Sequence, residues 1–177
     1  MHINIFGASG SGSTTLGKVL GERLNYPCFD GDDYFWMPSE IPFTVKRDPL
    51  ERNALLNQAL KAHDNWIVSG SVVGWNNNWD FDLSVFLYIP HELRMDRLKK
   101  RELERYGQTI YTDPQRNKLY HKFLDWAQGY DDNTTQGRTL QVHQNWMKNL
   151  QKALLIIEGD TTVEERVEAI LVKLAQM

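Results

Sequence analysis

Residues 7–14 read Gly-Ala-Ser-Gly-Ser-Gly-Ser-Thr, which has the residue types and spacing of a phosphate-binding loop. They follow an apolar run at residues 3–6 and precede an amphipathic run at residues 16–24, the strand, turn and helix order that such a loop requires. Glycines permit backbone conformations that other residues avoid, so that loop N–H groups can face an anion at the positive end of the helix. The segment therefore predicts a nucleotide phosphate site; the alternative is a glycine-rich turn that binds nothing.

Ser13 is the one departure from the pattern G-x-x-x-x-G-K-[S/T], because it occupies the position of the lysine that places a positive charge on the outer phosphates. Lys18 cannot substitute from within the helix, since it lies roughly 7 Å along the axis and about 140° round it. We therefore expect the substitute cation elsewhere in the chain. Thr14 keeps the hydroxyl expected to face magnesium. The residues expected to bind the nucleotide are Gly7, Ala8, Ser9, Gly10, Ser11, Gly12, Ser13, Thr14 and Thr15.

Three carboxylates, Asp30, Asp32 and Asp33, follow a short apolar run at residues 28–29. In an open α/β sheet, ligands bind beyond the carboxyl ends of the strands, where the phosphate loop also lies. We expect Asp32 to accept a proton from a substrate hydroxyl or to help hold magnesium through water, and Asp30 and Asp33 to contact substrate. The alternative is an acidic turn in which the aspartates cap backbone N–H groups.

Several cationic and small residues are further candidates for contacts with a substrate. Arg94, Arg97, Arg101 and Arg105 recur at three- and four-residue spacing, which predicts one stripe on a helix; this stripe either neutralises transferring phosphate, with Arg97 and Arg101 foremost, or is a solvated basic face. The remaining candidates are Arg47 and Arg52 near a helix start, Gly70 and Ser71 after the third strand, and Arg138 and His143 in a polar-aromatic region.

The elements that would position these residues alternate between strands and helices along the chain. We expect strands at residues 3–6, 28–29, 65–69, 82–89 and 153–157. We expect helices at residues 14–25, 49–62, 91–106, 115–128 and 138–150, and after Thr162. The helices at residues 115–128 and 138–150 are expected to form a hairpin that covers the site as a lid.

Composition limits the possible classes of protein. The 177 residues, 41% hydrophobic and 24% charged, are typical of one globular domain. A net charge of −3 argues against a protein built mainly to bind nucleic acid, and the single cysteine excludes an intrachain disulfide. No apolar run approaches 18 residues, so we expect no membrane span, and cytoplasmic residence is the default expectation. We expect residues 1–177 to form a single domain, with an acceptor-side segment at about residues 34–64 and a lid at about residues 105–150.

Taken together, these segments resemble the P-loop small-molecule kinases, the group that contains adenylate, shikimate and gluconate kinases. The resemblance rests on residues 7–14, on residues 85–90 followed by Glu92, Arg97-Leu98 and Arg101, and on the closing run at residues 155–160, and it covers nearly the whole chain. The aromatic segment from Phe123 to Trp146 looks closest to uncharacterised bacterial adenylate-kinase-like ATPases.

The resemblance implies a parallel five-stranded sheet in the order 2-3-1-4-5 with helices on both faces. It also implies ATP on residues 7–14 and magnesium near Thr14 and Asp32. Asp32 would take the proton of the acceptor, Gly70 and Ser71 would line the acceptor pocket, and Arg97 and Arg101 would contact phosphates.

Three functional hypotheses remain at this point. The first is an ATP- and magnesium-dependent kinase acting on a small metabolite or nucleotide. The second is a nucleotide-binding regulator that lost efficient catalysis with the lysine that Ser13 replaces. The third is a nucleic-acid or partner-binding domain that uses the basic helix, which the acidic net charge disfavours.

Overall fold

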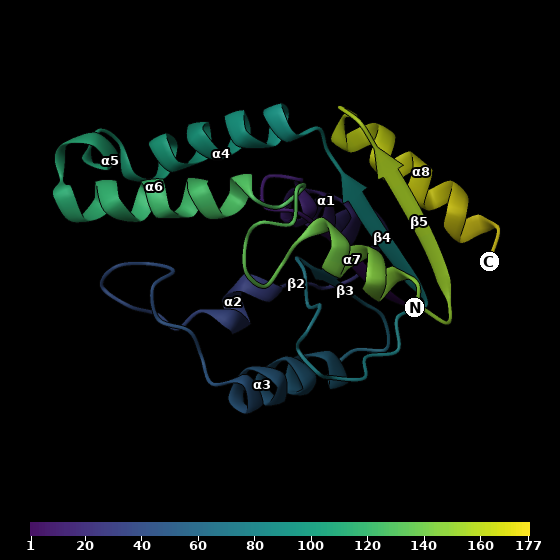
Figure 1. The fold of residues 1–177 in the computed structure, drawn as a ribbon. Helices are drawn as coiled ribbons and strands as arrows, with labels where there is room; N and C mark the ends of the chain where they lie inside the picture. The colour runs from purple at the N-terminus through teal and green to yellow at the C-terminus, as the bar shows by residue number, and fades with distance from the viewer.

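A five-stranded parallel sheet forms the centre of the molecule in the computed structural model, which describes residues 1–177 (Figure 1). The strands are β1 (His2–Gly7), β2 (Cys28–Asp30), β3 (Trp66–Ser69), β4 (Leu83–Tyr88) and β5 (Ala153–Glu158). Their order, β2-β3-β1-β4-β5, and their parallel pairing confirm the expected fold. Because all five strands run the same way, the loops that follow β1, β2 and β3 lie at one edge of the sheet.

Side chains that alternate along the strands divide the core between the two faces of the sheet. On one face, Ile3, Ile5 and Val85 pack with Leu16 and Leu20 of α1 (Ser13–Leu24). Helix α8 (Val163–Ala175) covers the same face with Val167 and Ile170, beside α1. This layer fixes the start of α1, and with it the glycine-rich loop, against the end of β1.

The opposite face is covered by α3 (Pro49–Lys61) and α7 (Leu140–Met147) (Figure 1). Leu56 and Leu60 of α3 pack with Trp66 and Val68. The rings of His143 and Trp146 in α7 meet Phe6 edge-on, with centroids 5.3 and 4.8 Å away. Much of the aromatic content of the chain is thus used in this layer.

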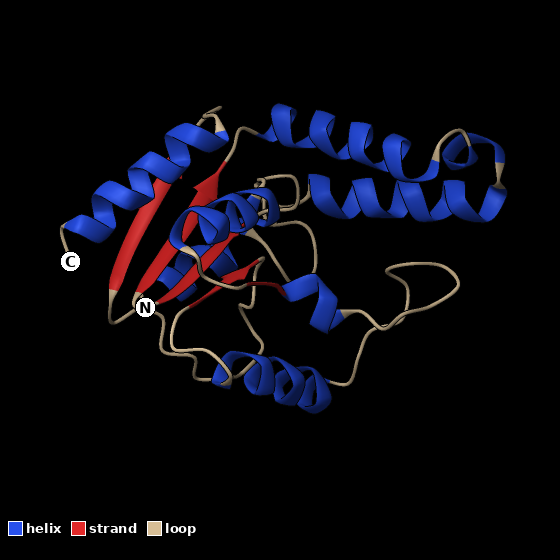
Figure 2. Cartoon of the chain, turned by 180° about the vertical axis from the view of Figure 1, so that it is seen from behind, coloured by secondary structure: helices blue, strands red, loops and turns tan.

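The helices α4 (His91–Tyr106) and α6 (Pro114–Gln128) lie side by side and project from the sheet, joined at their far end by α5 (Thr109–Thr112) (Figure 2). Met95 and Leu98 of α4 pack with Ala127 of α6. The pairing differs from the expected hairpin, because α6 pairs with the preceding helix whereas α7 packs on the sheet. The sequences of α6 and α7 are both amphipathic, and an amphipathic pattern shows that a helix has a buried side without showing which element that side packs against.

Local sequence signals set the starts of two helices. Asp48 accepts hydrogen bonds from the backbone N–H groups of Leu50 and Glu51, so α3 begins with proline in its first turn. Thr162 and Glu165 form a capping box at the start of α8, where the sequence predicts a helix after Thr162. No helix in the structure combines the length and the apolar character that crossing a bilayer demands.

The apolar residues of the helix at residues 49–62 would be expected to face the core, but Leu55 does not. Leu55 is partly exposed, whereas Arg52, one turn before Leu56, is buried. The guanidinium of Arg52 lies over the Trp75 ring, 4.1 Å from its centroid, and 5.5 Å from that of Phe35. Aromatic faces stabilise a buried cation, which explains why arginine takes the inward place.

Candidate functional site

Glycine is needed at the turns of the loop after β1. Gly10 and Gly12 have φ angles of 83° and 90°, in the left-handed region that other residues rarely adopt. At Gly7, a Cβ atom would lie 2.5 Å from the carbonyl oxygen of Leu87 on the neighbouring strand. The loop therefore turns tightly at Gly10 and Gly12 and packs closely against β4 at Gly7, as the glycines of the pattern at residues 7–14 predict.

The loop ends at the N-terminus of α1 with unused hydrogen-bond donors. Gly12 is the N-cap and supplies no side chain, and the first helical bond runs from the Leu16 N–H to the Gly12 carbonyl over 3.0 Å. The backbone N–H groups of Ser13, Thr14 and Thr15 precede that bond, at the positive end of the helix dipole. This part of the chain can receive an anion without rearranging its hydrogen bonds.

The cations that reach the loop come from two distant helices and not from α1. Lys18 borders a shallow groove with Glu22 and Cys28, away from the loop. Arg94 of α4 is 1% exposed and donates to the Ser9 carbonyl over 3.2 Å, and Arg166 of α8 is 2% exposed and donates to the Ser11 carbonyl over 2.9 Å. The loop is therefore held between two buried guanidinium groups.

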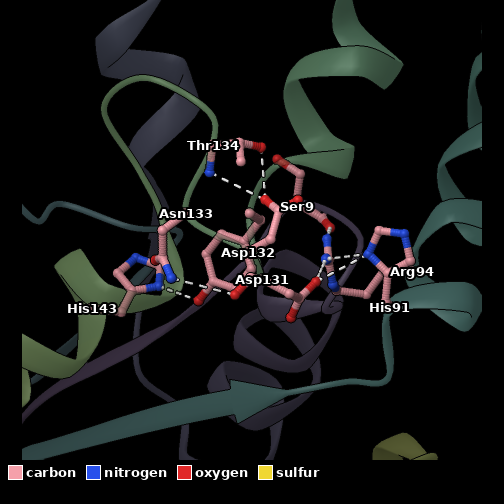
Figure 3. Close-up of polar contacts among 9 residues, drawn as sticks. Ser9, His91, Arg94, Asp131, Asp132, Asn133, Thr134 and His143 are labelled. Atoms are coloured by element: carbon pink, nitrogen blue, oxygen red, sulfur yellow. Dashed lines mark hydrogen bonds and ion pairs between the residues drawn. The ribbon is translucent and has the colours of Figure 1, made fainter.

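Arg94 belongs to a polar cluster that joins the loop to the segment after α6 (Figure 3). Its guanidinium pairs with the Asp131 carboxylate, which also accepts from His91 over 3.1 Å. The Tyr130 ring lies 5.0 Å from the same guanidinium. Because Asp131 balances the charge of Arg94, this arginine fixes the loop and is not one of the exposed cations of the expected stripe.

Asp32 lies in α2 (Gly31–Phe35), directly after β2, at the same edge of the sheet as the loop. Asp30 caps α2, since its carboxylate accepts from the Asp32 N–H over 3.0 Å, which is the structural alternative considered for this cluster. Water reaches Asp32, but the surrounding protein removes part of its hydration and raises the pKa of the carboxyl. The positive charges of Arg138 and Arg101 oppose that rise.

The charges that act on Asp32 show which expected site residues come together. Arg101 and Arg138 come from α4 and from the segment before α7, and the charge of Asp32 acts on both of their guanidinium groups. Arg138 lies over the Trp126 ring, 5.3 Å from its centroid. Neither guanidinium lies within ion-pair distance of Asp32, and Arg101 is 3.4 Å from the Glu102 carboxylate. The positive charges that act on Asp32 at the carboxyl edge of the sheet can favour an anionic group next to a proton acceptor.

The remaining expected residues lie around this edge with contacts of their own. Arg97 pairs with Asp160 over 2.7 Å, and Arg47 donates to the Tyr34 carbonyl and pairs with Glu51. Arg47 thereby joins α2 to α3, and its role as a substrate ligand stays a prediction.

Asp33 is exposed, and its pKa is raised by partial burial and by Asp30, with Lys18 opposing.

Gly70 and Ser71 follow β3 and lie beside the acidic cluster and α7. Gly70 has a φ of 90°, and a Cβ atom there would lie 3.6 Å from the Asp30 carboxylate. The Ser71 hydroxyl hydrogen-bonds to Nε2 of His143 over 2.8 Å, and Nδ1 of that ring bonds to the Tyr130 hydroxyl over 2.6 Å. His143 is fully buried between them, so burial, together with the charge of Arg138, lowers its pKa to about 3.

This histidine makes folding stability depend on pH. Because the folded pKa of about 3 lies below the unfolded value of 6.5, the stabilisation is complete above about pH 6.5 and is lost as pH falls towards the folded pKa. We expect the wild-type protein to lose about 2 kcal/mol more unfolding free energy between about pH 7.5 and about pH 5 than His143→Gln, which cannot titrate. Urea unfolding at both pH values measures the difference, and equal losses in the two proteins would contradict it.

Four contributing residues did not emerge from sequence reasoning as site residues: Arg166, Asp131, Tyr130 and Trp126. Arg166 had a usable signal, because it lies three residues after Val163 and four before Ile170, on the apolar face of an amphipathic helix. A charged residue is rarely buried on such a face without a partner or a role. Asp131 sits in a polar turn-rich segment where nothing local distinguishes it from its neighbours.

Known proteins resemble this chain in sequence. The family profile AAA_18, described as an AAA domain, matches residues 3–118. The chain is 41% identical over 172 residues to the uncharacterized protein YqaC of Bacillus subtilis, covering 96% of this chain and 95% of that protein. It is 30% identical over 146 residues to the shikimate kinase of Rippkaea orientalis, covering 69% of this chain and 75% of the relative. A cytidylate kinase of Haloarcula marismortui is 28% identical over 113 residues, 58% of this chain and 59% of that enzyme.

Solved structures show the same fold. A deoxyadenosine kinase of M. mycoides with bound dATP superposes with a TM-score of 0.61 at 16% identity, over 99% of this chain and 100% of that one. The shikimate kinase of Aquifex aeolicus has a TM-score of 0.54 at 20% identity, over 99% and 97% of the two chains. With the loop after β1, the sheet order and a profile that matches more than half of the residues, the chain belongs to the AAA_18 family of P-loop kinase domains.

Proposed function

We propose that this protein transfers the γ-phosphoryl group of ATP to a small metabolite or nucleotide that carries a hydroxyl or phosphate group. The observation that carries the proposal is the position of Asp32. This residue follows β2 at the same edge of the sheet as the loop after β1, and the positive charges of Arg101 and Arg138 act on its carboxylate. Phosphoryl transfer needs little covalent chemistry from the protein and depends on positioning and on neutralising charge. The kinase relatives support this reaction class.

In the proposed reaction, an acceptor oxygen forms a bond to the γ-phosphorus while the bond between that phosphorus and the β,γ-bridging oxygen breaks. ADP leaves with the bridging oxygen, and the proton of an acceptor hydroxyl passes to the Asp32 carboxylate. The loop at residues 7–15 holds the phosphates of ATP, mainly through the free N–H groups of Ser13, Thr14 and Thr15. Arg97, Arg101 and Arg138 neutralise the negative charge spread over the transferring group.

The residues present fit a magnesium ion that is held mainly by the phosphates of a bound nucleotide. No group of three or more histidine, cysteine or acidic residues could hold a metal by itself. Magnesium in kinases needs only one or two protein ligands, because substrate phosphates and waters supply the others. The Thr14 hydroxyl and, through water, the Asp32 carboxylate would hold the ion, which would supply charge neutralisation at the β- and γ-phosphates.

The acceptor side favours an anionic or polar acceptor. Arg52 is buried on the Trp75 and Phe35 rings and has no carboxylate within ion-pair distance, so its charge is available to a ligand. The Trp75 ring also lies close to Gly31, the residue before Asp32: a Cβ atom on Gly31 would be 3.9 Å from the ring. The proposed acceptor pocket therefore comprises Arg52, Gly70 and Ser71 with the acidic cluster, and an acceptor with a carboxylate or phosphate would fit it.

ATP binding is the first test of the proposal. We expect micromolar binding of ATP with magnesium to the wild-type protein by isothermal titration, and none to Gly12→Asp, because a carboxylate there strains a φ of 90° and repels the phosphates. Gly74→Asp is the matched control, since Gly74 has a φ of 76° with no atom within 4 Å of a Cβ, outside the loop. A folded wild-type protein that binds no ATP would remove the proposal.

Acceptor screening by ADP release then separates the kinase from a second candidate. Ser13 at the lysine position favours a nucleotide-binding regulator with little transfer. Nucleoside monophosphates, deoxynucleosides, shikimate and gluconate are the panel, because they span the acceptor types of the relatives and structural neighbours. Tight ATP binding without ADP release for any acceptor would favour the regulator.

A further inference from the structure

The loop without a lysine has a buried arginine whose hydrogen-bonding capacity is not fully used. Arg166 is 2% exposed, and its Nε donates to the Thr161 hydroxyl over 2.8 Å. One terminal nitrogen, Nη1, donates to the Ser11 carbonyl over 2.9 Å. The other, Nη2, is buried and has no partner. A buried guanidinium nitrogen without an acceptor is costly, so an acceptor is expected when the site is occupied.

The position of this guanidinium is defined by the loop itself. A Cβ atom on Gly12 would lie 3.2 Å from Nη1 of Arg166, so the arginine occupies the space that a side chain at the N-cap of α1 would need. Ser11 and Gly12 directly precede the position that a lysine normally holds in this pattern. The arginine therefore approaches the loop within two residues of the missing charge, from α8 instead of from α1.

The charges around Arg166 also favour an anion. Arg97 of α4 adds a second positive charge, and burial together with Arg97 lowers the pKa of Arg166, while Asp160 and Glu165 oppose that change. Asp160 pairs with Arg97 and is exposed, with 59% of its side chain accessible. Asp160 and Glu165 offset the charge of the buried guanidinium only in part, since neither lies within ion-pair distance of Arg166 and Asp160 pairs with Arg97 instead.

We propose that Arg166 supplies the positive charge that Ser13 cannot, with its free Nη2 donating to the phosphate chain of the bound nucleotide. Arg94 does not fill this role, because the Asp131 carboxylate already balances its charge. This inference rests on the proposed nucleotide site and deepens it, because it assigns the substitute cation.

Titration of ATP and of inorganic tripolyphosphate, which has no base, tests the inference. Loss of one charge-assisted hydrogen bond predicts that Arg166→Gln binds both ligands about 10- to 100-fold more weakly than the wild-type protein. Ser13→Lys in the Arg166→Gln background is expected to restore at least about tenfold, since it returns a cation to the normal position. Arg23→Gln is the charge-matched control, because Arg23 forms exposed pairs with Glu164 and Glu168 and lies outside the loop.

The outcomes separate this inference from the proposed function. Wild-type binding together with unchanged affinity in folded Arg166→Gln would overturn the assignment of Arg166 alone. Weakened binding that Ser13→Lys fails to restore would mean that Arg166 only shapes the loop, and would also overturn it. A wild-type protein that binds neither ATP nor tripolyphosphate would overturn the nucleotide site itself.

Discussion

Asp32→Asn is expected to lower the turnover number for phosphoryl transfer by about 10²- to 10⁴-fold while leaving the dissociation constant of ATP within about twofold of wild type. The amide keeps the shape of the carboxyl but cannot accept the proton of the acceptor. Asp32 lies after β2, whereas the nucleotide N–H donors lie after β1, and its proposed contact with magnesium runs through water, so the change leaves the direct contacts to ATP in place. Initial rates of ADP release, once an acceptor is found, and isothermal titration measure the two quantities.

The pH profile of the same reaction gives an independent check on Asp32. Partial loss of hydration raises the pKa of Asp32 above the value of 3.8 for an unperturbed aspartate. As the pH falls, Asp32 therefore becomes protonated, and can no longer accept a proton, at a higher pH than an unperturbed aspartate would. The acid limb of turnover should therefore lie above that value. Asp96→Asn is the control, since Asp96 is an exposed residue of α4 that pairs only with Lys99. Equal turnover in Asp32→Asn and Asp96→Asn would remove Asp32 from the mechanism.

The features of the fold that the sequence predicts are those with local causes. Each such feature is caused by residues within a few positions of it. Examples are the alternation that buries Ile3 and Ile5 on one face of β1, the turn at Gly10 and Gly12, and the helix start capped by Asp48. The order of the strands is not local, and it was obtained from the resemblance of the whole chain to a family. A parallel sheet leaves the order of its strands open until the crossover connections are known.

What sequence reasoning missed depends on contacts between residues far apart in the chain. Arg166 and Ser11 are 155 positions apart, and Ser71 and His143 are 72 apart. Helical periodicity assigned α6 an apolar side but gave no reason for it to pair with α4 and not with α7. Hence the motif after β1 was found from its spacing, whereas the groups that complete its charge could be found only from the packing of α4 and α8 against it.

The pair of Arg94 and Asp131 predicts a large loss of stability when only the carboxylate is removed. Asp131→Asn is expected to lower the unfolding free energy by about 3–5 kcal/mol, because it leaves a guanidinium that is 1% exposed without its counter-charge. Arg94→Met is expected to cost less, since the Asp131 side chain is 23% exposed and His91 remains 3.1 Å from its carboxylate. Urea unfolding monitored by tryptophan fluorescence gives both values, with Asp132→Asn as the neighbouring exposed control.

The double variant Arg94→Met/Asp131→Asn distinguishes an unpaired charge from a general loss of packing. If the unpaired guanidinium causes the loss in Asp131→Asn, adding Arg94→Met removes that charge, and the double variant should be more stable than Asp131→Asn alone by at least about 1 kcal/mol. Additive losses would instead show that the two side chains contribute independently. In the double variant the Ser9 carbonyl also loses its donor, so we expect ATP to bind more weakly than to the wild-type protein even where stability recovers.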